Sequence, residues 1–264
     1  MPSLWIGPPG KLRAIDDAAT EFDRSVSLGV TEFQSLGGGV TVTSLPTPPR
    51  RLALSWTGLL PGDAEWLDAL ARRVFGPSPL GVLDPSARNL LDGAQSQGYG
   101  PVGSWELVGQ GSLLQQADGT VAVTGTGTAS ELRWRHPYWP GWPVIPGQQI
   151  TFSTSLPAST SRCQLNWYEA RGYGGSVSGR GSTITETPSY PWLFVGPAII
   201  PGPTTTPLVI GPAVLRIAAP APAAGSFPLG DGCPAMAVTG YTDRPTTTAR
   251  DLSLSLVEVR RAGS

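Results

Sequence analysis

The sequence predicts a mainly β protein of two domains, and three observations carry this prediction. Of the 264 residues, 34 are glycine and 28 are proline, while only 14% are charged; this composition suits short strands joined by tight turns. Most apolar segments alternate with polar residues at a period of two. Helical periodicity is clear in one segment. We therefore expect a small N-terminal β-sandwich or barrel with one helix, followed by a C-terminal antiparallel β-sandwich of jelly-roll type.

The first domain, residues 1–92, carries the strand pattern on both sides of its helix. Residues 40–44 and 51–56 alternate valine, leucine or tryptophan with polar or small residues, which predicts two half-buried strands. A connection containing Pro46, Pro48 and Pro49 separates them. Gly37–Gly39 predicts a turn, and residues 80–83 predict a short strand that Asp84-Pro85 ends.

The helix is predicted over residues 63–75. Asp63 follows Pro61-Gly62 and can cap the helix, and Gly76-Pro77 ends it. Apolar side chains recur on one stripe at Trp66, Leu67, Leu70, Ala71 and Val74.

Residues 93–103 are rich in Gly, Gln and Ser and are predicted to be a linker. The second domain, residues 104–264, shows no helical period. Asp118-Gly119 between apolar pairs predicts a hairpin, and Leu252, Leu254 and Leu256 alternate with serines in the last predicted strand. This pattern favours a β-sandwich.

The charge balance argues against nucleic acid as a partner. The formal net charge is −1, so no basic field gathers phosphates. No apolar run is long enough to span a bilayer, and residues 1–5 show no secretory pattern. We expect no cofactor and no metal, because the single histidine has no second histidine or cysteine cluster at metal-ligand spacing.

An aromatic segment is the most conspicuous candidate site. Its rings are Trp134, His136, Tyr138, Trp139 and Trp142. If exposed, they suit stacking on sugar rings or a protein contact. If buried, they fill the edge of the sandwich, and the sequence leaves these alternatives open.

Enzymatic chemistry is not expected. No serine lies in a nucleophile elbow, and paired carboxylates for glycoside hydrolysis lack a recognisable pattern. Arg171–Gly181 resembles a short arginine-glycine tract but is interpreted as a mobile loop. Cys163 and Cys233, the only cysteines, are either buried thiols or a disulfide. The carboxylates of the second domain that could form a pair for glycoside hydrolysis are Glu169, Glu186, Asp231, Asp243, Asp251 and Glu258.

Residues 48–91 resemble the N-terminal domain of phage distal tail proteins and related minor tail proteins. The resemblance is carried by Pro48-Pro49-Arg50, a strand ending in Ser55-Trp56, the helix that starts at Asp63, the segment 79–85, and Arg88-Asn89-Leu90-Leu91. The second domain resembles a galectin-like or carbohydrate-binding-module-like jelly roll through residues 145–153 and 165–172.

The resemblance implies a ring, commonly a homohexamer, that continues the tail tube at the tail tip of a virion assembled in the host cytoplasm. It implies contacts with the tail tube protein, the tail hub and receptor-binding proteins. The alternative is a glycan-binding tail module that contacts the host cell wall. A ring requires a self-complementary contact that repeats by a closed rotation.

Overall fold

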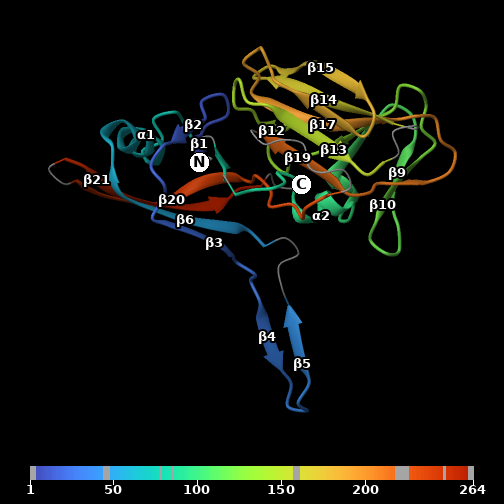
Figure 1. Ribbon diagram of the computed structural model, residues 1–264. Coiled ribbons are helices and arrows are strands. Elements are labelled where there is room, and N and C mark those ends of the chain that lie inside the picture. Colours follow the sequence, from blue (N-terminus) through green and yellow to red (C-terminus); the bar gives the residue numbers. More distant parts are fainter. Residues whose placement is uncertain are drawn as a thin grey trace. The chain divides into compact units, whose positions relative to one another are not determined.

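The protein is described by a computed structural model that covers residues 4–43, 48–77, 79–84, 86–156, 161–217, 226–245 and 248–260. Antiparallel strands dominate, so the predicted mainly β fold class is confirmed (Figure 1). The chain divides into two compact units. The first unit holds residues 4–8, Arg13–Val82 and Pro234–Arg260, and the second holds Pro9–Leu12 and Leu83–Cys233.

One seven-stranded sheet and helix α1 (Pro61–Ala71) form the body of the first unit. Its strands are β1 (Leu4–Gly7), β2 (Arg13–Ile15), β3 (Glu21–Val26), β6 (Arg50–Leu59), β7 (Leu80–Leu83), β20 (Ala235–Pro245) and β21 (Arg250–Glu258). They lie in the order β2-β1-β7-β20-β21-β6-β3. Leu54, Leu254 and Leu67 are buried in one core, so α1 supplies the layer that covers the sheet.

Helix α1 differs from the prediction at both ends. It begins at Pro61, whose fixed φ suits the first helical position, and Leu60 is the N-cap. Asp63 is not the cap; its carboxylate accepts hydrogen bonds from the Arg13 guanidinium at 2.7 Å and the Asp16 N–H at 3.1 Å. The helix ends at Ala71, four residues earlier than predicted, because Arg73 adopts a left-handed φ of 58°.

The predicted boundary of the second domain is wrong at its C-terminal end. The chain after Pro234 returns to the first unit, where β21 pairs with β6 through Leu254 opposite Leu54 and Leu256 opposite Leu52. Both strands carry their leucines at period two, so the pairing buries one continuous apolar face. Residues 104–264 are therefore not one β-sandwich.

The predicted linker is also wrong. Gly93–Gln97 forms helix α2, in which Asp92 accepts the Gln95 N–H at 2.8 Å as the N-cap. Gln95 and Ser96 are buried, and Gly98 ends the helix with a φ of 76°. These residues are a packed part of the second unit.

The second unit contains antiparallel sheets of six and three strands, with a further three-stranded sheet. The six-stranded sheet has the order β15-β14-β17-β11-β8, with β12 paired to β17; the others are β16-β13-β19 and β18-β10-β9. Their bounds are β8 (Trp105–Val108), β9 (Ser112–Gln115), β10 (Val121–Thr124), β11 (Glu131–Trp134), β12 (Trp142–Pro143), β13 (Ile150–Thr154), β14 (Ser161–Glu169), β15 (Gly172–Arg180), β16 (Thr183–Glu186), β17 (Phe194–Pro201), β18 (Leu208–Val209) and β19 (Ala213–Ile217), and a 3₁₀ turn covers Val102–Ser104. The arginine-glycine stretch, expected as a mobile loop, forms strand β15.

No helix within these described ranges is long and apolar enough to cross a membrane.

Candidate functional site

The predicted aromatic site is part of the core of the second unit. Trp134 and Trp142 are each 1% exposed, His136 is 6% exposed and Trp139 is 9% exposed, while Tyr138 is half-buried. The four buried rings present no open faces for a sugar to stack on. The structure therefore supports the packing alternative for this segment.

His136 holds the segment in place through both ring nitrogens. Nδ1 accepts the backbone N–H groups of Tyr138 and Trp139, each at 3.1 Å. Because Nδ1 accepts, the proton lies on Nε2, which donates to the Cys233 carbonyl at 2.8 Å. The imidazole also stacks on Trp139 with centroids 4.9 Å apart, so its role is structural.

Trp142 connects the segment to the beginning of the second unit. Its indole N–H donates to the Leu90 carbonyl at 2.7 Å. The neighbouring Asn89 is fully buried and makes four hydrogen bonds to backbone groups. The Asn-Leu-Leu pattern of residues 89–91 thus has a packing function.

A different candidate site lies on one face of the six-stranded sheet, where polar side chains gather. Five strands align one residue each in a row across this face. Directly opposite partners share a face of the sheet, so these side chains lie on the same side. In the order β15-β14-β17-β11-β8 the row is Ser178, Gln164, Ala198, Arg133 and Glu106.

Glu131 is the centre of a hydrogen-bond network on this face. Its carboxylate accepts from the Gln164 amide at 3.1 Å, from the Asn166 amide, and from the Arg133 guanidinium at 2.8 Å. The Glu131 hydrogen bond raises the pKa of Arg133. Asn166 is fully buried, so the network fixes these groups before any ligand arrives.

Aromatic rings flank this network at the β14–β15 turn. The Tyr168 ring lies against Gly196, where a Cβ would come within 3.0 Å of it. Burial raises the pKa of Tyr168. Tyr173 lies edge-on to Tyr168 at 6.1 Å and is 58% exposed. We name Glu106, Glu131, Arg133, Gln164, Asn166, Tyr168 and Tyr173 the polar face.

This site was not predicted from the sequence, although strand β14 carries a signal for it. In β14 the polar residues Gln164 and Asn166 alternate with Cys163 and Leu165. That alternation identifies one face of the strand that carries hydrogen-bonding groups, and the structure buries both Gln164 and Asn166 on it. The partners from β8 and β11 are about 30 to 60 residues away in sequence, so only strand pairing unites them.

Carboxylates considered for hydrolysis are dispersed. Asp243 pairs with Arg250, and Glu258 pairs with Arg260, in the first unit. Among the described residues, no three His, Cys, Asp or Glu side chains group closely enough to hold a metal. Cys163 and Cys233 are both buried and are not joined to each other, so the disulfide alternative is wrong.

An exposed hairpin is the second candidate, and we name residues 31–43 the arm. It consists of β4 (Thr31–Gln34) and β5 (Val40–Thr43) joined by a turn at Gly37–Gly39. All eight strand residues are exposed, including Val40 and Val42, so the half-burial expected for β5 is wrong. Two strands alone are marginally stable in water, so the arm requires a partner surface to be rigid.

Comparison with known proteins does not identify a family for this chain. No family model and no curated protein matches the chain. Among solved structures, the chain is similar to an N-terminal endo-1,4-beta-D-xylanase 10B from Clostridium thermocellum, whose CBM22-1 and GH10 modules are complexed with xylohexaose. The identity is 8% and the TM-score 0.24, over 67% of this chain and 29% of that chain. The match therefore spans under a third of that structure's length, and nothing about the function of this chain follows from it.

Proposed function

We propose that the protein is a structural component of a phage tail tip, where its first unit assembles with further copies into a ring. The proposal is supported mainly by the exposure of apolar side chains on the arm. Its valines and Phe33 face water in the single chain, and such exposed apolar surface marks a contact with another protein surface. The resemblance of residues 48–91 to distal tail proteins supplies the phage context. The proposal includes no enzymatic step.

The ring would join the tail tube to the tail hub and the receptor-binding proteins, and a homohexamer is the stoichiometry that the resemblance implies. Light scattering after size-exclusion chromatography tests self-assembly, with a mass several times the 27.5 kDa of the chain as the expected result. Antibody labelling of purified virions tests location. A strict monomer that is absent from virion tails contradicts the proposal.

The polar face favours a second candidate function, recognition of a cell-wall glycan by the second unit. The exposed Glu106 carboxylate and the partly exposed Arg133 guanidinium match sugar hydroxyls, and the exposed Tyr173 ring provides a stacking surface. Calorimetric titration with host cell-wall saccharides tests this function. Tyr173→Ser should weaken binding about tenfold or more, the equivalent of a stacking contact near 1.4 kcal/mol.

The matched control for that experiment is Tyr99→Ser. Tyr99 is 47% exposed and lies outside the six-stranded sheet. Equal affinities for the two variants would reject the polar face as the binding surface.

A further inference from the structure

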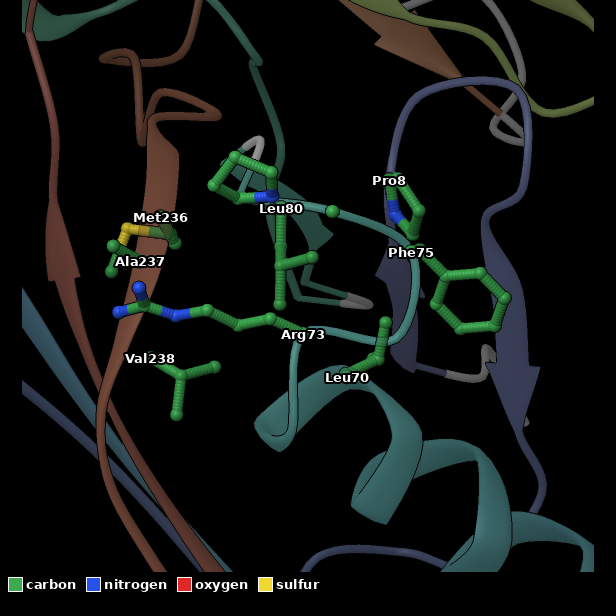
Figure 2. A pocket seen from close by; sticks show the side chains of 10 residues that line it. Pro8, Leu70, Arg73, Phe75, Leu80, Met236, Ala237 and Val238 are labelled. Carbon is green, nitrogen blue, oxygen red and sulfur yellow. The ribbon is translucent and has the colours of Figure 1, made fainter.

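A small apolar pocket opens on the first unit beside the end of helix α1. Its volume is about 80 Å³. Small-molecule sites usually measure several hundred Å³, so this pocket suits individual side chains instead. Figure 2 shows the lining side chains, which include Leu70, Phe75, Leu80, Met236 and Val238.

Of the described residues that line the pocket, Arg73 alone is charged. Figure 2 shows its side chain extending from the helix end toward Ala237 and Val238 on β20. Among the described residues its guanidinium has no ion-pair partner. The pocket therefore offers an apolar floor with one unpaired positive charge.

The backbone at Arg73 is strained. The N–H of Arg73 donates to the Leu70 carbonyl and that of Val74 to the Ala69 carbonyl, both at 3.0 Å, which is the helix-ending pattern that normally places glycine in the left-handed position. Here arginine occupies it with a φ of 58°. A strained conformation directs attention to function, and the pocket is where this side chain lies.

The sheet is incomplete beside the pocket. Strand β20 pairs with β7 only through Ala235 and Met236, whereas it pairs with β21 as far as Pro245. Beyond Met236, no strand of the described chain covers this edge of β20. Uncovered strand edges accept strands from other chains.

One face of the arm complements this surface. Glu32 lies opposite Val42, and Gln34 lies opposite Val40, so these four residues share a face. Val40 and Val42 are 60% and 57% exposed. Glu32 is the only charged residue between Ser25 and Thr43, and no ion pair to it is found among the described residues.

We propose that the arm of one copy docks on the pocket of a second copy, with Val40 and Val42 over the apolar floor and the Glu32 carboxylate on the Arg73 guanidinium. This inference rests on the proposed self-assembly and identifies the contact that produces it.

The first experiment measures the assembly constant by sedimentation. Val42→Asp should weaken assembly at least about tenfold, because it places an unpaired charge on the apolar floor. Glu32→Arg and Arg73→Asp should each weaken it, and the double variant should recover most of the loss by restoring opposite charges. Aspartate tolerates the left-handed backbone of position 73. Thr41→Asp adds the same charge on the opposite face of the arm, so this variant is the matched control and should assemble like the unaltered protein.

Arg73→Gly separates the contact from folding. Glycine relieves the left-handed strain, so the melting temperature should rise by about 2–4 °C. Assembly should nevertheless weaken, because the guanidinium is lost. A variant that is more stable and also assembles normally would overturn the proposal.

Cysteine pairing distinguishes a second copy from the same chain. Val42→Cys and Ala237→Cys are prepared as separate proteins and mixed under oxidising conditions. Docking between copies should give a cross-linked dimer of one of each variant. No cross-link while the unaltered protein assembles means that the arm docks elsewhere, which refutes this inference and leaves the proposed function standing. A monomeric unaltered protein refutes both.

Discussion

Replacement of Asn89 by aspartate tests how the second unit is held together. The Asn89 amide donates to the Ala213 and Pro228 carbonyls at 2.9 and 3.0 Å, and its oxygen accepts the Leu91 and Leu215 N–H groups at 3.1 Å each. Aspartate has the same shape but loses both donors. The buried Ala213 carbonyl and the partly buried Pro228 carbonyl would then face a carboxylate.

The expected cost follows from these two orphaned acceptors. Each buried polar group without a partner costs about 1–3 kcal/mol, so Asn89→Asp should lower the free energy of unfolding by about 4 kcal/mol at pH 7. A total stability of about 5–15 kcal/mol makes this a large fraction. Urea denaturation followed by tryptophan fluorescence measures it.

The pH dependence gives an independent check. Burial and the facing carbonyls should raise the pKa of the new carboxyl above its unfolded value. A raised acid pKa stabilises the protonated folded form, so stability is present at low pH and lost as the pH rises through the folded pKa. The deficit should therefore be smaller at pH 4 than at pH 7. Gln115→Glu, an exposed change of the same type, is the control. A deficit below about 0.5 kcal/mol at pH 7, typical of surface substitutions, would refute the reasoning.

Three further predictions concern packing in the second unit. Trp142→Phe should cost about 1–3 kcal/mol in the free energy of unfolding, because it removes the donor to a buried carbonyl. Trp134→Phe should cost less, since the Trp134 indole N–H has no hydrogen-bond partner among the described residues. Gly98→Ala should lower the melting temperature more than Gly147→Ala: both have left-handed φ values, 76° and 75°, but a Cβ at 98 would lie 2.0 Å from a carbonyl oxygen and one at 147 meets nothing within 4 Å. Burial raises the pKa of the Cys163 thiol to about 12, so a thiol reagent at pH 8 should label it only as fast as the protein unfolds; rapid labelling of folded protein would contradict this burial.

The local elements followed from sequence because their causes are local. The alternation of Leu54 with the small residues Ala53 and Ser55, and of Leu252, Leu254 and Leu256 with serines, predicted strands that the structure confirms. The stripe at Leu67 and Leu70 predicted α1. Its early end was not predictable, because only the left-handed backbone of Arg73 reveals it.

Tertiary structure decided which elements are neighbours. No local sequence pattern indicates that the strand at Leu254 pairs with the strand at Leu54, some 200 residues earlier. The predicted C-terminal end of the second domain was therefore wrong. The sequence also did not decide whether the aromatic segment is buried, because the same rings suit a sugar-binding surface or a core. The tertiary structure decides it: His136 is hydrogen-bonded to the distant Cys233 carbonyl. The polar face exists only because register aligns Gln164 with residues of distant strands. Side-chain period is a property of a few consecutive residues, whereas pairing and burial depend on the whole chain.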